Sequence, residues 1–368
     1  MDFKKERAEE EVEEYETEEE EVDDESEEEE SEEEEEESDD DEEESDDEEE
    51  SDDEEESDDE SEEESDDESE EESDDEEESD DEEEEEEEES DDEDCEDCEE
   101  EYDETFTITF GDQGENHAGM QKIGKLASEG MSIEEILKIK KKFDEKGFKT
   151  EFIRLNDLLD VKIEEKEKEK IEEACVVVVR NGLRLLLDNV KDATHDFFDE
   201  QDVLEKDTKA LMRGRVVNKR ARYNLCFSDF SQKANFEEGK GTVVDFKNMA
   251  LLSKARKNIG EIFGEKCKNL IAEGNYYYDP SVCGIGYHGD GERKIIVGIR
   301  VGKEMPLSFR WYHRFNIVSP TKKIMLKHGD IYFSSEKAVG FDWKKSSKYT
   351  LRHAAGCESF LDTKNDMK

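Results

Sequence analysis

The charge of this chain divides it into two parts that cannot fold in the same way. Residues 1–104 hold 79 of the 120 acidic residues against three basic ones, and so carry a net charge of −76. Residues 105–368 hold the other 41 acidic and 47 basic residues, a net charge of +6. Like charges repel one another in the first part, which has too little apolar surface to offset the entropy lost on folding. We therefore expect 1–104 to be a disordered acidic low-complexity region.

The acidic region offers charge rather than structure. Residues 22–94 repeat the motif SDDEEE with variants and show no apolar periodicity, so they do not read as a solenoid. Such a tract attracts basic proteins, which we expect as partners. Cys95 and Cys98 form a single CxxC pair, but a zinc site needs a second pair of ligands, and none lies nearby in the sequence.

The cysteines and the hydropathy place the chain in a reducing, aqueous compartment. The seven cysteines are an odd number, and most are scattered, which is typical of reduced thiols. There is no apolar run of about 18 residues that could cross a membrane. We expect an intracellular protein, cytoplasmic or nuclear, with no membrane contact.

Residues 105–204 alternate between strand and helix patterns. A helix is expected to begin at Ser132, which forms a capping box with Glu135, and to bury Ile133, Ile136, Leu137 and Phe143. A charged helix is expected over 162–173, and strands over 105–110, 150–155 and 175–179. This alternation predicts a small α/β module of unknown role over 105–204.

Residues 205–368 show a different sequence pattern, with one helical region followed by many short strand-like runs. A broken amphipathic helical region at 246–273 is followed by short strand-like runs at 275–278, 283–288, 294–301, 307–312, 324–326, 331–334 and 348–353. Short strands at this spacing favour a β-sandwich or barrel. The fold class predicted for the chain is therefore α+β, with a β-rich C-terminal domain.

Within this domain, His288 and Asp290 form a His-x-Asp pair between a glycine-rich segment and a strand. On an extended segment, residues two apart point to the same face. With a third ligand from a distant strand, imidazole and carboxylate leave open metal positions for a cosubstrate and dioxygen, the pattern of non-haem Fe(II) sites. The alternative is that both residues only cap a turn of a β-sandwich.

The segments around His288 resemble the AlkB-like branch of the 2-oxoglutarate oxygenases, in which an Asn-x-Tyr strand precedes the His-x-Asp pair as N-x-Y…G-x-H-x-D. Asn275, Tyr277 and Gly286 fall into that pattern here. Segments 220–229 and 327–333 are similar to the family's nucleotide lid and to the strand before its third ligand. The resemblance covers roughly 205–356 and is closest to AlkB-like proteins of large DNA viruses and algae.

The resemblance implies a double-stranded β-helix, or jelly roll, over 205–368 that binds Fe(II) and 2-oxoglutarate, with Asn275 and Tyr277 contacting 2-oxoglutarate. The family's usual position for the third ligand falls on Lys344. His353 is the next histidine, and we expect it to be the ligand; otherwise the site is degenerate. The family's closing arginine motif is not intact, but Arg352 matches its last arginine by sequence context. If His353 is the ligand, related oxygenases carry a basic residue roughly ten positions further on, at Lys364 here. The resemblance therefore implies Arg352 and Lys364 as cosubstrate-binding residues.

Two further histidines are weaker candidates. His328 and Asp330 form a rival His-x-Asp pair, but only 25 residues separate His328 from His353, too few to cross a jelly roll and return. We expect His328 to lie in a turn. His313 stands in an aromatic run, and we expect it to pack on a sheet.

A basic segment over 213–222 runs into Tyr223. Basic residues beside an aromatic ring suit a nucleic-acid strand, so Arg220, Arg222 and Tyr223 are candidates to bind single-stranded nucleic acid or a flipped base. A solvated basic helix is the alternative. The function predicted is a dioxygenase, an oxidoreductase that hydroxylates or demethylates a nucleic-acid base. Protein hydroxylation, or a non-enzymatic acidic interaction protein on a degenerate oxygenase fold, remain open.

Overall fold

The computed structural model describes residues 102–159 and 163–361. The predicted disorder of 1–104, apart from its last three residues, lies outside this range, as do Cys95, Cys98 and Lys364. In the described part, no helix is both long enough and apolar enough to cross a lipid bilayer.

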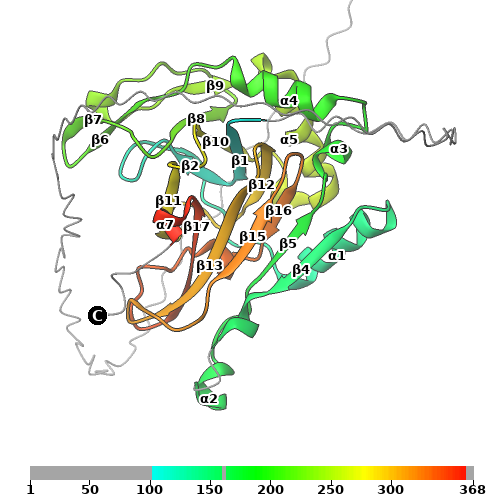
Figure 1. The fold of residues 1–368 in the computed structure, drawn as a ribbon, viewed down its shortest axis with the longest axis vertical. Helices are drawn as coiled ribbons and strands as arrows, with labels where there is room; N and C mark the ends of the chain where they lie inside the picture. Colours follow the sequence, from blue (N-terminus) through cyan, green and yellow to red (C-terminus); the bar gives the residue numbers. More distant parts are fainter. Residues whose placement is uncertain (1–101, 160–162, 362–368) are drawn as a thin grey trace, which may run out of the picture. The chain divides into compact units, whose positions relative to one another are not determined.

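Two β-sheets dominate this α+β protein (Figure 1). The larger is a curled, half-barrel sheet of eight strands, in the order β4 (Thr150–Arg154), β5 (Cys175–Val179), β16 (Ile331–Ser334), β12 (Val297–Gly302), β1 (Thr105–Gly111), β10 (Ile271–Tyr277), β8 (Tyr223–Ser228) and β9 (Val243–Asp245). The smaller runs β11 (Gly284–His288), β17 (Tyr349–Gly356), β13 (Met305–His313) and β14 (Asn316–Ile317), with β15 (Lys322–Leu326) also paired to β13.

Helices cover one face of the larger sheet. Side chains alternate along each strand, so Phe106, Ile108 and Phe110 of β1 all point to that face and join a core formed with the helices. The helices that contribute to this core are α1 (Ile133–Glu145), α3 (Leu183–Leu186), α4 (Ala193–Asp202) and α5 (Ala250–Phe263). The covered face is therefore structural.

The opposite face of the larger sheet is the inner one, toward the smaller sheet. Val176, Val178 and Tyr332 share a second apolar core with Phe309 and Trp311 of β13. The central strands instead place polar side chains on this inner face, and these are buried or half-buried: Thr105, Thr107 and Thr109 on β1, Glu273 and Asn275 on β10, and Arg300 on β12. Buried polar groups between two sheets mark the region where a site can form.

Most predicted elements are confirmed. The strands at 175–179 and 331–334 coincide with β5 and β16, and the Ser132 capping box is present at the start of α1. Leu137 was expected in the core but is 44% exposed, because it faces away from the sheet. The charged helix expected over 162–173 is only the short α2 (Glu165–Lys168), which lacks an apolar face.

The separate module predicted over 105–204 is wrong. Strands β1, β4 and β5 come from that segment, but they lie in the same sheet as β8, β10, β12 and β16. Strand β1 is central, paired antiparallel to β10 on one side and to β12 on the other. Alternation of strands and helices is a local pattern, whereas this sheet is built from pairings between residues far apart in the chain.

Short elements complete the described part. Two hairpins stand apart from the main sheets: β2 (Gln113–Glu115) with β3 (Lys122–Gly124), and β6 (Lys209–Met212) with β7 (Arg215–Asn218). Two short helices, α6 (Glu336–Val339) and α7 (Glu358–Leu361), flank β17 in the sequence.

Candidate metal centre

The structure brings His288, Asp290 and His353 together. Strands β11 and β17 are paired, and the register sets His288 opposite His353. The Nε2 atoms of both imidazoles lie 3.4 Å from Asp290 Oδ1, and one potential ligand atom from each residue lies within 4.8 Å of the others. His353 points inward with Phe309, a member of the inner core. Two imidazoles and one carboxylate converging in this way form the donor set of a facial metal site.

The backbone around His288 fixes the orientation of its ring. His288 Nδ1 lies 2.8 Å from the carbonyl oxygen of Gly286. Because a carbonyl can only accept a hydrogen bond, Nδ1 carries the proton, which leaves the lone pair of Nε2 directed at the cluster. The Asp290 backbone N–H donates to the carbonyl of Val339, which fixes the loop after His288.

Gly289 is required by close packing between the two ligands. A Cβ atom at this position would lie 2.2 Å from the carbonyl oxygen of Gly340 and 2.6 Å from Cβ of Trp343. Only glycine allows the His-x-Asp loop to approach the segment after α6 this closely. The glycine between the two ligands therefore serves the geometry of the site.

Charge in the site favours the ligand forms of its residues. Burial raises the pKa of the Asp290 carboxyl, but Arg293 and the two imidazoles outweigh it and hold that pKa well below its usual range. Burial also lowers the pKa of His353, more than Asp290 raises it. An ionised carboxylate and a neutral imidazole are the forms that bind a metal ion.

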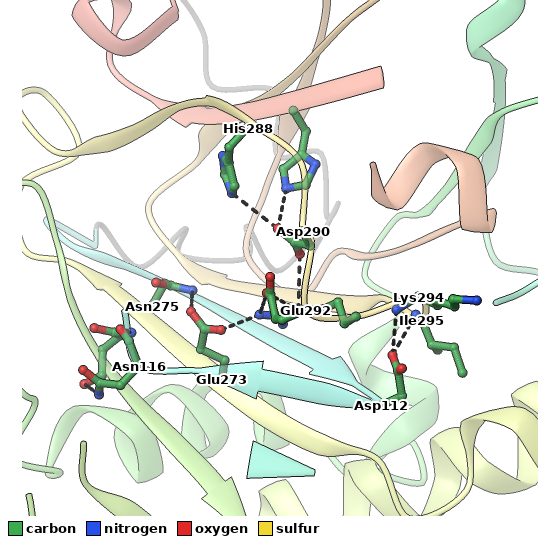
Figure 2. Close-up of polar contacts among 12 residues, drawn as sticks. Asp112, Asn116, Glu273, Asn275, His288, Asp290, Glu292, Lys294 and Ile295 are labelled. Atoms are coloured by element: carbon green, nitrogen blue, oxygen red, sulfur yellow. Dashed lines mark hydrogen bonds and ion pairs between the residues drawn. The ribbon is translucent and has the colours of Figure 1, made fainter. Parts of the chain in front are cut away.

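Arg293 forms a second layer behind Asp290. It is 4% exposed, and its Nε lies 3.3 Å from Asp290 Oδ2. Its Nη2 is 2.6 Å from both Glu273 Oε2 and Glu292 Oε1. Figure 2 shows Asp290 between the imidazoles on one side and this charged layer on the other. Arg293 engages Oδ2 and leaves Oδ1 facing the imidazoles. Sequence reasoning missed this residue, although it lies three residues after Asp290.

Asp112 holds the far end of the same loop (Figure 2). Its buried carboxylate accepts hydrogen bonds from the backbone N–H groups of Ala127, Lys294 and Ile295 at 2.7 to 2.9 Å. A carboxylate with three backbone donors is a fixed anchor. The loop that carries Asp290 and Arg293 is thus fastened at both ends.

The predicted cosubstrate residues Asn275 and Tyr277 lie on the inner face of β10. Asn275 accepts a hydrogen bond from Arg222 Nε at 2.7 Å and donates to Glu273 at 3.1 Å, so its amide links the basic segment to the layer behind Asp290. Tyr277 is 3% exposed. The structure therefore places a predicted substrate residue, Arg222, against a predicted cosubstrate residue.

Arg300 is a second residue that sequence reasoning missed. It is 1% exposed on the inner face of β12, with its guanidinium 5.9 Å from the centre of the Tyr277 ring. Its Nε and Nη1 atoms are buried and have no hydrogen-bond partner among the described residues. A signal was present, because a single arginine interrupts the otherwise apolar run 295–301.

Arg352 does not join the metal cluster. It precedes His353 on β17 and points to the opposite face, where its guanidinium lies 4.2 Å from the centre of the Tyr312 ring and 5.0 Å from that of Trp343. Neighbouring residues on a strand face opposite sides of the sheet, so Arg352 and His353 cannot share one site. The assignment of Arg352 to 2-oxoglutarate is therefore corrected. Lys344 is exposed and lies over Trp343.

The basic segment forms a hairpin rather than the helix considered as an alternative. Strands β6 and β7 are joined at Arg213 and Gly214, which both have positive φ. At its base, the carbonyl of the exposed Arg220 accepts a hydrogen bond from the Tyr278 hydroxyl, and the Tyr223 ring stacks on Tyr278 at 5.1 Å. The end of the basic segment therefore lies beside the stacked rings.

The other histidines have structural partners, as expected. His328 Nδ1 accepts a hydrogen bond from the Gly302 N–H, while Asp330 accepts from the N–H groups of Asn181 and Lys327, so this pair belongs to a turn. His313 stacks on Tyr349 with ring centres 4.2 Å apart.

Comparison with known proteins gives a relative for the chain. It is 46% identical over 261 residues to the uncharacterized protein R156 of Acanthamoeba polyphaga mimivirus, an alignment that covers 71% of this chain and 99% of the mimivirus protein. The chain belongs to the R156 family. No family model matches it. Membership of the R156 family establishes a viral relation but assigns no activity, because the mimivirus protein is itself described as uncharacterized.

Proposed function

We propose that this protein is an Fe(II)- and 2-oxoglutarate-dependent dioxygenase of the AlkB-like type. The observation that carries the proposal is the convergence of His288, Asp290 and His353, with both Nε2 atoms 3.4 Å from one carboxylate oxygen. The remaining carboxylate oxygen is held by Arg293. A structural turn would need neither this convergence nor a buried arginine behind the carboxylate.

The strand arrangement supports a jelly roll. Strands β16, β12, β1 and β10 are neighbours in one sheet, and β11, β17, β13 and β15 form the core of the other, with all of these pairings antiparallel. Eight antiparallel strands in two facing sheets are the composition of a jelly roll. Seven of them come from 271–356, and β1 completes the sandwich from a segment far upstream.

Each residue of the site has a definite role in this proposal. His288, Asp290 and His353 would hold the iron through Nε2, Oδ1 and Nε2. Iron and 2-oxoglutarate, when bound, supply the oxidant that hydroxylates a C–H bond. Gly286 fixes the proton of His288 on Nδ1, and Arg293 fixes the orientation of Asp290. The two sheets exclude water from the inner face.

A nucleic-acid base is the proposed substrate. The basic β6–β7 hairpin and the Tyr223–Tyr278 stack lie at the end of the inner face where Arg222 reaches Asn275. Phosphates bind cations, and bases stack on aromatic rings. Hydroxylation of an N-methyl group would then release the methyl carbon as formaldehyde.

The proposal is tested by metal binding and turnover together. We expect the purified chain to bind one Fe(II) and to release succinate from 2-oxoglutarate, and His288→Ala or Asp290→Ala to lose both activities while remaining folded. His328→Ala and His313→Ala are matched controls, since neither residue lies in the cluster, and they should retain both. Retained turnover in both ligand variants would refute the assignment.

A further inference from the structure

We infer that Arg300 binds the distal carboxylate of a dicarboxylic 2-oxo acid whose other end lies at the metal centre. This inference rests on the proposed function and deepens it, because it identifies the cosubstrate anchor by a residue that none of the sequence motifs indicated. The sequence had pointed to Arg352 and Lys364.

Arg300 is a buried cation that forms no ion pair within 4 Å with an acidic side chain of residues 102–159 and 163–361. Its side chain is enclosed between the sheets at 1% exposure, and neither Nε nor Nη1 has a partner in the described part of the chain. Buried donors of a charged group that lack hydrogen-bond partners are strongly destabilising, and a bound anion would satisfy them. The orphaned donors therefore call for an anion.

Nearby carboxylates are already engaged by other cations. Asp330 follows Gly329 at the start of β16, but its carboxylate oxygens accept hydrogen bonds from Arg180 at 2.6 Å and from the Asn181 N–H at 2.9 Å. Glu273 and Asp290 are bound by Arg293. These three carboxylates are thus engaged by Arg180 and Arg293, which leaves Arg300 for a ligand.

The neighbours of Arg300 extend this site toward the metal. Thr107 is its direct partner on β1, shares its face, and has a buried hydroxyl that also lacks a partner among the described residues. Tyr332 packs over Gly298 on the same strand as Arg300. Burial raises the pKa of the Tyr332 hydroxyl, while the nearby Arg300 lowers it and Asp290 raises it, so both charges lie close enough to act on the same buried hydroxyl.

The chemistry of the ligand follows from the two ends of the proposed site, the metal centre and Arg300. A 2-oxo acid can chelate a metal through its keto oxygen and adjacent carboxylate, using the positions that a three-residue facial site leaves open. A second carboxylate can then accept charge-assisted hydrogen bonds from the orphaned guanidinium donors. The Thr107 hydroxyl adds a further donor.

The experiment compares 2-oxoglutarate with pyruvate, a 2-oxo acid that lacks the distal carboxylate. Each would be titrated by calorimetry into the full chain loaded with Mn(II), for the wild type and for Arg300→Met. We expect the wild type to bind 2-oxoglutarate at least about thirtyfold more tightly than pyruvate, the loss usual when one partner of a buried charge pair is absent. Arg300→Met should bind both equally, with unchanged Mn(II) affinity.

Three further variants make the result specific. Arg352→Met removes an arginine from the opposite face and should keep the preference for 2-oxoglutarate. Arg300→Lys should keep part of the preference for 2-oxoglutarate over pyruvate. Thr107→Val should weaken the binding of 2-oxoglutarate but not that of pyruvate. Arg300→Met should also melt at an equal or higher temperature without ligand, because an unpaired buried charge has been removed.

The possible failures are distinct. If the wild type binds neither Mn(II) nor any 2-oxo acid, the proposed function is wrong and the inference falls with it. If the wild type prefers 2-oxoglutarate and Arg300→Met keeps that preference, only the Arg300 assignment is overturned. If Arg300→Met does not fold, Arg300→Lys and Thr107→Val test the assignment instead. An unchanged preference for 2-oxoglutarate over pyruvate in both variants would overturn it.

Discussion

At the scale of single residues, the site depends on how one carboxylate is oriented. Asp290 faces two imidazoles through Oδ1 and Arg293 through Oδ2. A residue that orients a metal ligand in this way contributes to metal affinity without contacting the ion. Arg293 is itself fixed by Glu273 and Glu292, so the orientation of Asp290 is set by three charged groups acting together.

We predict that Arg293→Gln weakens Mn(II) binding about 10- to 100-fold, the usual cost of losing a group that orients a metal ligand. Paramagnetic resonance titration of free Mn(II) gives the affinity directly. Arg352→Gln is the matched control, since that arginine lies on the outer face of β17, and its Mn(II) affinity should stay within twofold to threefold of the wild type. Equal losses of Mn(II) affinity in both variants would mean that Arg293 does not act specifically through Asp290.

The third ligand gives a second residue prediction. His353→Ala should lose metal binding as completely as His288→Ala, because each supplies one of three donor atoms within 4.8 Å of one another. Lys344→Ala, at the family's usual ligand position, should bind metal normally because Lys344 lies exposed over Trp343. Normal iron stoichiometry in His353→Ala would show that the three-residue centre is wrongly assigned.

At the scale of elements, the turn after β11 positions both ligands. Gly289→Ala would force a Cβ against Gly340 and Trp343, so we expect a loss of stability of about 1–3 kcal/mol from overpacking, together with weaker metal binding. Gly286→Ala is a close control, because a Cβ there has no atom within 4 Å. Urea unfolding measures the stability of both variants, and we expect a lower midpoint for Gly289→Ala than for Gly286→Ala. Similar midpoints would contradict the close-packing argument.

The β6–β7 hairpin is the element that the substrate proposal needs. Arg213→Glu with Arg215→Glu should weaken binding of single-stranded DNA or RNA and reduce its salt dependence, as expected when phosphate contacts are lost. Lys141→Glu with Lys257→Glu, on helices α1 and α5, makes the same change in net charge elsewhere. Fluorescence anisotropy at two salt concentrations compares them. Equal weakening by both pairs would assign the effect to net charge and not to the hairpin.

Sequence patterns predicted the elements better than their arrangement. Apolar runs such as 175–179 and the capping box of Ser132 are local signals, and both were read correctly. The His288–Asp290 pair was also visible, because two ligands lie close in sequence. Arg300 was missed because its environment is formed by strands distant in sequence, and the role of β1 was missed for the same reason.

At the scale of the whole molecule, one strand joins segments that the sequence had separated. Strand β1 lies between β10 and β12 and carries Thr107 beside Arg300. A chain without residues 1–104 should therefore fold and bind metal, whereas one without 1–111 should not unfold cooperatively, because two central strands lose their partner. Thermal unfolding followed by circular dichroism compares them. A cooperative transition and metal binding in the shorter chain would show that the sheet and the site form without β1.

The central claim is that His288, Asp290 and His353 hold an iron ion that 2-oxoglutarate chelates. Anaerobic titration of the protein with Fe(II) and then 2-oxoglutarate tests it directly, because chelation produces a visible metal-to-ligand charge-transfer band. The account predicts this band at one iron per chain in the wild type and its absence in Asp290→Ala and His353→Ala. A folded wild-type protein that gives no band with saturating iron and 2-oxoglutarate would contradict it.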